Sequence, residues 1–396
     1  MRARGAVAYA AGLVAFLCAG LWLGGHPAKL PEFARDAFVA SPAGLTAEAS
    51  ELIEDSYFRS VGETELSNAS LQGMVRELRQ RHDDRFSEYF SPESRESFNQ
   101  AIEGRFSGVG MSVVPVKRGL RVVQVFPGSP ADEAGIVVGE TVVSVDGDSI
   151  AGESSTEATG KIKGPEGTEV TVGVRDAKGG EVRQLRLTRA EVTLPNVSSR
   201  LETVDGRRLG YVRMLSFSEG AHAQLANGIR KVQREGAKGI VLDLRGNPGG
   251  LLDEAVLSAS LFLAESQVVV STESRSQGRS VHKAVGGTLP ERPIVVLIDR
   301  GTASAAEILA AALSEDADAP VVGTRSFGKG VFQEEQGLAN GGALKLTVGE
   351  YFTPDGVNLA RSKGIHPEVK ASDDPETTED EGKERALRVL AGQVEG

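Results

Sequence analysis

The spacing of apolar residues divides this chain into regions of different secondary structure. Over residues 45–101 apolar side chains recur at every third or fourth position, which predicts helices. Over residues 106–188 the pattern changes to short apolar runs separated by turn residues such as Asp146-Gly147, which predicts strands. Beyond Glu191 strands and helices alternate, which predicts an α/β core. We therefore expect an α/β protein of several domains.

Two aliphatic runs mark buried strands of this core, at residues 239–244 and 293–299. A loop after the first run leads into a predicted helix over 251–264, and the alanine-rich residues 303–313 predict a helix after the second. Ser304 is therefore expected at a turn from strand to helix. Unpaired N–H groups and the positive end of the helix dipole meet at such a turn.

The first 25 residues differ from the rest. An apolar run over residues 6–25 follows Arg2 and Arg4 and is long enough to span a bilayer. No small-x-small cleavage site follows it, so we expect an uncleaved single-pass anchor in the cell membrane with the remaining chain outside the cytoplasm. The alternative is a cleaved signal peptide and secretion. Cys18, the single cysteine, lies in this run, which leaves no disulfide framework and no thiolate metal site.

Length and charge limit the classes of function. A chain of 396 residues with 40% hydrophobic content can bury two or three cores. The formal net charge is -11 and the basic residues are scattered, which argues against a nucleic-acid partner. The acidic segment 371–396 predicts a flexible, solvated tail. The oligomeric state stays open.

Ser304 and Lys329 are the candidate reactive groups. A serine nucleophile needs a base, and none of the five histidines lies in a triad signature. Lysine can replace histidine when it is neutral, and Lys329 lies between two glycines where backbone can approach closely. Each residue also has an ordinary alternative, because Ser304 and Glu307 have the spacing of a capping box and most lysines are simply solvated.

A phosphate-binding loop is excluded for the Lys329 segment. That motif requires Ser or Thr after the lysine to bind Mg²⁺, and Gly330 stands there.

An oxyanion formed by attack of Ser304 needs two N–H donors. The Ala305 N–H at the helix start is one candidate. The loop Pro248-Gly249-Gly250, which follows the neighbouring strand, can present the other from Gly249 or Gly250. The sequence leaves the choice between these two glycines open.

The strand-rich region resembles a PDZ domain. The resemblance rests on Phe106-Ser107-Gly108-Val109-Gly110-Met111, on residues 127–136 and 138–140, and on Val145-Asp146-Gly147. It implies that Phe106, Ser107, Gly108, Val109, Gly110 and Met111 form a loop whose N–H groups hold a peptide's terminal carboxylate, beside a strand edge that pairs with the peptide. The alternative for the glycines is an ordinary turn.

Four segments in one order resemble the carboxyl-terminal processing peptidases, also called tail-specific proteases: residues 243–250, 301–307, 326–333, and 344–348 with 351–356. The resemblance implies a crotonase-like β/α core and a serine endopeptidase whose PDZ domain captures a substrate's C-terminus. It makes Ser304 the nucleophile, Lys329 the general base and Gln333 the residue that orients the lysine. Ala306 and Val331-Phe332 depart from the family pattern without removing these groups.

The predicted organisation follows from these observations. We expect an anchor or signal peptide over 1–25, a helical domain over 45–103, a PDZ domain over 104–190, a protease core over 191–370 and an acidic tail over 371–396. The expected partners are unfolded or tagged proteins with apolar C-termini, and the chemistry requires no metal or organic cofactor. The alternative function is a non-catalytic, membrane-tethered PDZ receptor for protein C-termini. The joint presence of Ser304, Lys329 and Gln333 favours the enzyme.

Overall fold

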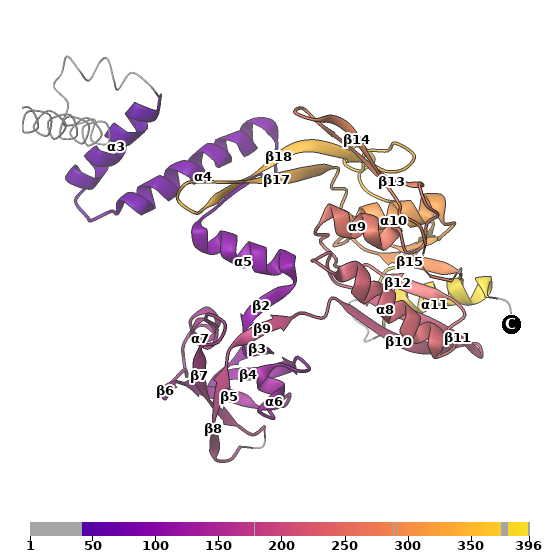
Figure 1. Cartoon of the computed structure of the whole chain (residues 1–396), viewed down its shortest axis with the longest axis horizontal. Coiled ribbons are helices and arrows are strands. Elements are labelled where there is room, and N and C mark those ends of the chain that lie inside the picture. The colour runs from indigo at the N-terminus through magenta and orange to yellow at the C-terminus, as the bar shows by residue number, and fades with distance from the viewer. Residues whose placement is uncertain (1–41, 178, 288, 291, 374–378, 395–396) are drawn as a thin grey trace, which may run out of the picture. The chain divides into compact units, whose positions relative to one another are not determined.

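The computed structural model describes residues 42–373 and 379–394, apart from 178, 288 and 291. These residues form two compact units (Figure 1). The first holds the described residues up to Pro92 together with Glu335–Leu346, and the second holds Glu93–Glu334 and the residues from Thr347 onward. The apolar segment predicted over 1–25 lies outside the described residues, and no helix within them is both long and apolar enough to cross a membrane.

The first unit contains the predicted helices and one strand. Helices α3 (Pro42–Ser56) and α4 (Glu63–His82) precede β1 (Glu88–Phe90), which pairs antiparallel with the start of β18 (Ala343–Phe352). The Tyr89 hydroxyl donates to Asn68 Oδ1 at 2.6 Å and accepts from Asn340 Nδ2 at 3.1 Å. The structure thus differs from a purely helical domain over 45–103, because β1 interrupts it and most of α5 (Pro92–Glu103) belongs to the second unit.

The PDZ-like region of the second unit is a small antiparallel sheet with its own core. Its strands run in the order β3-β4-β5-β7-β8, so β3 is an edge strand. The bounds are β3 Met111–Val116, β4 Gly119–Val125, β5 Thr141–Val145, β7 Glu169–Arg175 and β8 Val182–Thr188, with β6 (Asp148–Ser149) on β5 and helices α6 (Pro130–Glu133) and α7 (Ser155–Ile162). The prediction of short strands over residues 106–188 is confirmed, for example by β4, β5 and β7. A further pair, β2 (Arg105–Gly108) and β9 (Ala190–Thr193), joins the entry and exit of this region.

The following part of the unit contains a six-stranded sheet in the order β10-β11-β12-β15-β16-β19. All neighbours pair in parallel except β10 and β11. The bounds are β10 Val197–Val204, β11 Arg207–Met214, β12 Ile240–Asp243, β15 Ile294–Ile298, β16 Val321–Gly323 and β19 Val369–Lys370. The aliphatic runs at 239–244 and 293–299 therefore form the central strands, as predicted.

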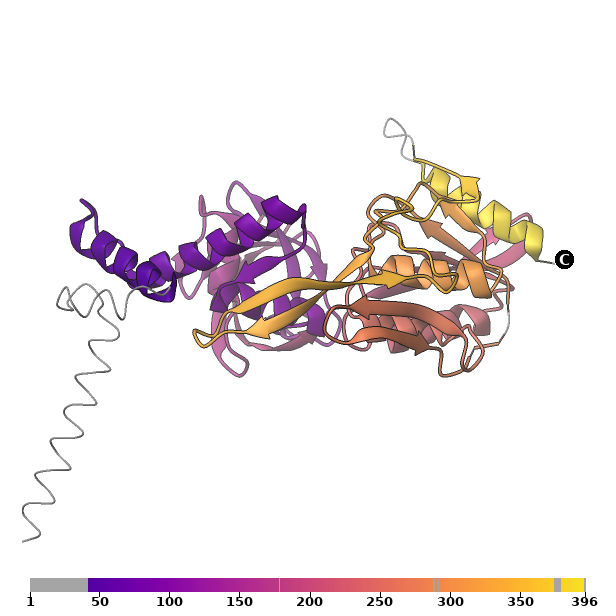
Figure 2. The ribbon, with the colours of Figure 1, turned by 90° about the horizontal axis from the view of Figure 1, so that it is seen from above.

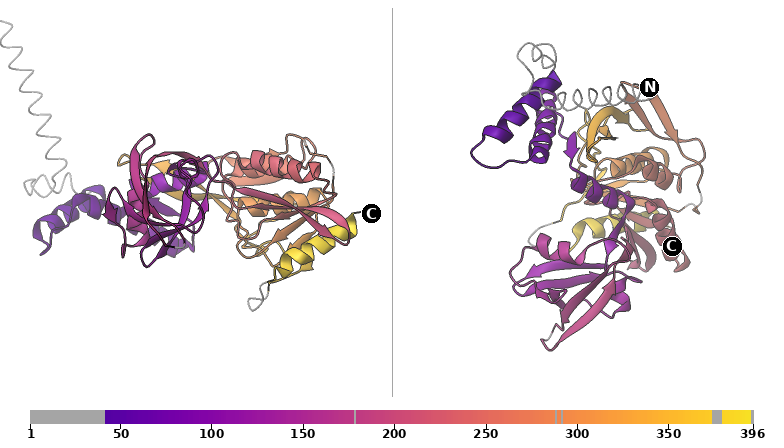
Figure 3. Two further views of the ribbon diagram at one scale, coloured as in Figure 1. Left: turned by 90° about the horizontal axis from the view of Figure 1, so that it is seen from below. Right: turned by 60° about the vertical axis from the view of Figure 1, so that its left-hand side comes forward.

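Helices cover both faces of this sheet. Helices α8 (Ala221–Arg234), α9 (Leu252–Ala259) and α10 (Ala305–Asp316) pack against alternate residues such as Ile240 and Leu242. Val241 faces the other way, toward α11 (Glu381–Gln393). Figures 2 and 3 show α11 in yellow on the side of the sheet away from α8 and α9. Because side chains alternate along a strand, continuous aliphatic runs are what a sheet covered on both faces requires.

A second sheet lies beyond α10. It joins β13 (Val268–Ser274), β14 (Gly278–Lys283) and β18, and β17 (Val331–Gly337) pairs with β18. Val331 to Gln333 lie at the start of β17, and β18 extends to Phe352. Tyr351 of β18 lies opposite Thr272 of β13.

The prediction of a flexible, solvated tail is wrong for the described part of residues 379–394. Helix α11 forms there, and its apolar face of Ala386, Leu387, Leu390 and Ala391 is buried against the sheet. The acidic residues that suggested a tail come mostly before this apolar stripe, and Asp380 caps the helix by accepting the Lys383 N–H at 2.8 Å. Residues 374–378 lie outside the described chain.

The helix predicted over 251–264 is also shorter than expected, since α9 ends at Ala259. The hydroxyl of Ser260 donates to the Val256 carbonyl at 2.7 Å. A serine side chain that binds a backbone carbonyl one turn earlier disfavours further helix.

Candidate active site

Ser304 lies at the turn between β15 and α10, as the sequence predicted. Its backbone has φ 55° and ψ −122°, a conformation that L-residues other than glycine rarely adopt. An ordinary N-cap residue is extended, with negative φ. Strain of this kind costs on the order of 1–3 kcal/mol and concentrates at functional sites. The turn therefore does more than begin a helix, although Ser304 and Glu307 do have the spacing of a capping box.

Glu307 holds the Ser304 turn and the Lys329 loop together. Its side chain is fully buried. One carboxylate oxygen accepts the Ser304 N–H at 3.0 Å and the Lys329 N–H at 2.9 Å. The other accepts the Gly328 N–H at 2.7 Å and the Ser326 hydroxyl. Burial raises the pKa of this carboxyl group above its ordinary value, although these hydrogen bonds oppose the shift.

The side chain of Lys329 meets that of Gln333. Lys329 Nζ donates to Gln333 Oε1 at 2.7 Å, and Gln333 Nε2 donates to Thr347 Oγ1 on β18 at 3.3 Å. Both Lys329 and Ser304 are partly buried. Since Gln333 is on β17 and Thr347 on β18, the pairing of these two strands fixes the direction of the lysine side chain.

The loop after β12 lies against the Ser304 turn. A Cβ atom placed on Gly249, which has φ +96°, would lie 2.8 Å from Ser304 Cβ and 2.9 Å from the Ala305 nitrogen, so only glycine fits. Buried Asn247 fixes this loop, accepting the Gly249 N–H at 2.9 Å and donating to the Met214 carbonyl at 3.0 Å. Within the described residues the N–H groups of Ala305 and Gly250 have no hydrogen-bond acceptor.

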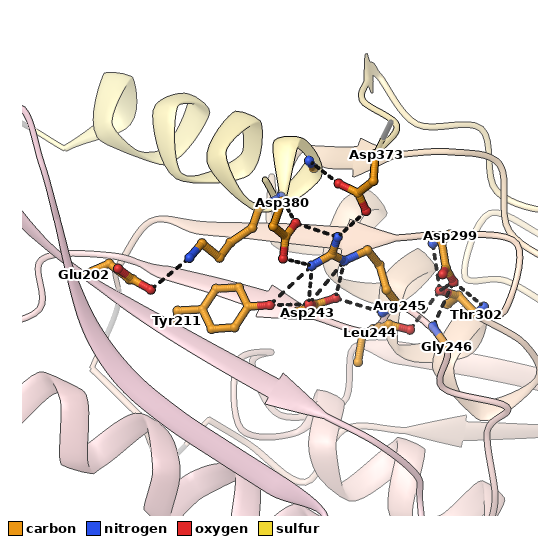
Figure 4. A network of polar contacts seen from close by, with 12 residues as sticks. Glu202, Tyr211, Asp243, Leu244, Arg245, Gly246, Asp299, Thr302, Asp373 and Asp380 are labelled. Carbon is orange, nitrogen blue, oxygen red and sulfur yellow. Dashed lines mark hydrogen bonds and ion pairs between the residues drawn. The ribbon is translucent and has the colours of Figure 1, made fainter. Parts of the chain in front are cut away.

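Asp299 joins the loops that follow β12 and β15 (Figure 4). Its carboxylate accepts the Gly246 N–H at 2.8 Å and the N–H groups of Gly301 and Thr302 at 2.9 and 3.1 Å. The Thr302 hydroxyl donates to the Leu244 carbonyl at 2.8 Å. The loops that follow β12 and β15 are thereby fixed to each other at the carboxyl ends of adjacent parallel strands, where such sheets form their sites.

Arg245 connects this edge of the sheet to α11 (Figure 4). It donates to Asp243 at 2.9 Å and to Asp380 at 2.8 and 2.9 Å, and Tyr211 donates to Asp243 beside it. Burial works against the charge on Arg245, but the hydrogen bonds with Asp380 and Asp243 outweigh it and raise its pKa. Burial and the Asp243 carboxylate together raise the pKa of Tyr211, so the phenol stays protonated.

The predicted PDZ loop is shorter than the resemblance implied. Phe106, Ser107 and Gly108 lie in β2 and Met111 begins β3, which leaves Val109 and Gly110 as the connection. The Val109 carbonyl accepts the Ala131 N–H at 2.8 Å, and the Gly110 carbonyl accepts the Phe126 N–H at 3.0 Å and the Ser129 hydroxyl at 3.1 Å. In the described part of the chain the N–H groups of Val109 and Gly110 donate to no acceptor. The carbonyls are therefore fixed while the amides stay available.

Sequence reasoning missed several residues of the site. Glu307 was recognised only as a capping residue, and no role was assigned to Asn247 or Asp299. Glu307 could have been found, because a glutamate at the third position of a helix that is apolar on all sides has to be buried. Asn247 and Asp299 each accept an N–H from a residue two or three positions away. Their contacts with Met214 and Gly246 join segments far apart in sequence, and for these no local signal was present.

Two protein-family models match parts of this chain. The sequence model of peptidase family S41 matches residues 208–371, and that of the PDZ domain matches residues 121–176. The carboxy-terminal processing protease CtpA of Bacillus subtilis is 35% identical over 324 residues, which cover 82% of this chain and 68% of that protein.

More distant relatives extend the comparison. A CtpA-like serine protease of Staphylococcus aureus is 32% identical over 321 residues, and the match covers 81% of this chain but 62% of that protein. A solved structure from Bacteroides fragilis, described as an S41 protease, covers 87% of this chain and 97% of its own with a TM-score of 0.53. At 19% identity this last likeness concerns the fold alone.

Proposed function

Because the chain belongs to the carboxy-terminal processing proteases of peptidase family S41, we propose that it cleaves polypeptides near their C-termini with Ser304 as nucleophile and Lys329 as general base. The observation that carries the proposal is the shared carboxylate of Glu307. A single oxygen of this residue accepts the backbone N–H of both Ser304 and Lys329. The two reactive side chains therefore start from backbone positions held together by one buried group.

The proposed reaction begins with neutral Lys329. As Ser304 Oγ attacks the scissile carbonyl carbon, its proton passes to Lys329 Nζ, and the protonated lysine then gives a proton to the leaving amine. Water hydrolyses the resulting ester by the same steps in reverse. Gln333 orients the lysine, since its Oε1 accepts the Nζ hydrogen bond at 2.7 Å.

The oxyanion would be held by the N–H of Ala305 and by one N–H of the Gly249-Gly250 loop. The Gly249 N–H already donates to Asn247 Oδ1, whereas the Gly250 N–H finds no acceptor in the described chain. This difference supports Gly250 as the second donor. The positive end of helix α10, which begins at Ala305, would add to the stabilisation.

We further propose that the PDZ region binds the C-terminus of the substrate. The free N–H groups of Val109 and Gly110 would hold the terminal carboxylate, and the unpaired edge of β3 would pair with the extended peptide. The partly exposed side chains of Phe106 and Met111 beside this connection support apolar C-termini as the preferred ligands. Residues 1–25 would anchor the protein in the cell membrane with its catalytic part outside the cytoplasm.

The experiment compares the parent protein with Ser304→Ala, Lys329→Ala and Lys329→Arg, using an unfolded protein with an apolar tail as substrate. We expect all three variants to lose cleavage. Lys329→Arg tests the base in particular, because arginine keeps the positive charge but does not lose its proton at a working pH. Substantial activity in that variant would exclude lysine as the base. Tail binding by a parent protein that cleaves nothing would instead support a receptor.

A further inference from the structure

The hydroxyl of Tyr351 is a buried polar group to which the mechanism above gives no role. Tyr351 is 2% exposed and belongs to the same packed core as Ala305 and Ala306. Among the described residues its hydroxyl has no hydrogen-bond partner. An unpaired buried hydroxyl costs about 1–3 kcal/mol, and phenylalanine would fill the same space without that cost. A tyrosine at this position therefore needs an explanation.

The side chain of Ser304 contacts this hydroxyl. Burial and the Glu307 carboxylate raise the pKa of Tyr351 well above its ordinary value, while the contact with the Ser304 side chain lowers it. The contact falls short of hydrogen-bond geometry in this structure. A phenol with a raised pKa keeps its proton at any working pH, so it remains available as a hydrogen-bond donor.

The backbone couples Tyr351 to the loop of the proposed base. The Tyr351 N–H donates to the Gly330 carbonyl at 3.1 Å, and Gly330 directly follows Lys329. Buried Asn358 reinforces this link, because its Nδ2 donates to the Gly330 carbonyl at 2.9 Å and to the Tyr351 carbonyl at 3.2 Å. The backbone of Tyr351 is thereby held to the loop that carries Lys329.

We propose that Tyr351 donates a hydrogen bond to Ser304 Oγ during the reaction, an inference that rests on the proposed roles of Ser304 and Lys329. In acylation the bond orients Oγ so that its own proton points toward Lys329 Nζ. That proton moves to Nζ, Oγ forms a bond to the carbonyl carbon, and the tyrosine keeps its proton.

The same donor acts when the acyl-enzyme breaks down. Water adds to the acyl carbon and gives a proton to Lys329 Nζ, and the bond between that carbon and Oγ then breaks. The electron pair stays on Oγ, where the Tyr351 hydroxyl stabilises the negative charge until Nζ returns the proton. Deacylation therefore depends on the tyrosine at least as strongly as acylation.

The test is Tyr351→Phe in the full chain, which removes one oxygen atom and keeps the packing. We expect a melting temperature equal to or above that of the parent, because an unpaired buried hydroxyl is lost, and a kcat about ten- to a hundredfold lower with KM unchanged. With an ester substrate, for which deacylation limits the rate, mass spectrometry should find the acyl adduct accumulating on Ser304.

Tyr89→Phe is the matched control. Tyr89 is also buried, but its hydroxyl is hydrogen-bonded to Asn68 and Asn340 in the first unit. We expect this variant to melt at a lower temperature and to keep the parental kcat. Parental kcat in Tyr351→Phe, or a loss of kcat accompanied by a fall in melting temperature as large as in Tyr89→Phe, would overturn the inference. Retained activity in Ser304→Ala or Lys329→Ala would instead overturn the proposed function itself.

Discussion

Replacing Glu307 with glutamine tests whether this one carboxylate assembles the active site. Each carboxylate oxygen accepts two hydrogen bonds: Ser304 and Lys329 donate to one, and Gly328 and Ser326 to the other. Glutamine keeps the shape but replaces one oxygen with an NH₂ group. Whichever way the amide turns, one side then presents a donor to backbone N–H donors, which leaves at least one of them unpaired.

The magnitude follows from the bonds lost. Hydrogen bonds to a charged group contribute about 1.5–3 kcal/mol each, so two lost bonds cost about 3–6 kcal/mol. Removing a buried charge returns part of this, and we expect the free energy of unfolding to fall by about 2–4 kcal/mol. Activity should fall further, because displacing a catalytic group by about 1 Å can cost about a hundredfold in rate. We expect kcat to fall at least about a hundredfold, with KM changed much less.

Urea unfolding and steady-state cleavage measure the two effects. Glu315→Gln is the matched control, because Glu315 lies on the same helix, is partly buried and accepts the Asp355 N–H at 2.8 Å. We expect it to lose about 1 kcal/mol of stability and to keep its kcat. Parental stability and kcat in Glu307→Gln, or equal losses in both variants, would refute the role assigned to Glu307.

Three further predictions follow from named contacts. Leu390→Ala should lower the free energy of unfolding, measured in urea, by about 2–5 kcal/mol, because Leu390 is fully buried against the sheet. Arg385→Ala is the control, because Arg385 is an exposed residue of the same helix. If Leu390→Ala is as stable as this control, α11 does not belong to the core. Burial opposes the charge on Asp380, but hydrogen bonds from Arg245 and the Lys383 N–H outweigh burial and lower the pKa of Asp380. The contribution of Asp380 to stability should therefore be complete above its ordinary pKa of 3.8 and be lost as the pH falls below that value. Asp380→Asn should therefore be less stable than the parent at pH 7, and the difference should narrow below pH 3.8 in denaturant unfolding; a constant difference would contradict the ion pair. Gly249→Ala should abolish labelling of Ser304 by a serine-acylating probe, because the new Cβ would lie 2.8 Å from Ser304 Cβ. Gly392→Ala on α11 meets open space and needs no positive φ, so it should retain labelling.

The sequence by itself determined the elements and the candidates. Apolar periodicity placed β12, β15 and the strands of the PDZ region, and the strand-to-helix position of Ser304 followed from the alanine-rich run after it. The positions of glycine and proline residues predicted the loops, including the one that carries Gly249. These signals are local, since each depends on residues within one element and its two ends.

Only the tertiary structure decided which distant groups meet. The spacing of Ser304 and Glu307 is that of a capping box, and nothing in it indicates that the same carboxylate also binds Gly328 and Lys329. The acidic residues before Glu381 suggested a solvated tail, yet Arg245 binds Asp380 and the stripe around Leu390 is buried. The backbone of Tyr351 likewise binds the Gly330 carbonyl, which lies on another segment of the chain. Hydrogen bonds and burial depend on where chain segments far apart in sequence come together, and a single sequence carries no local pattern for those distances.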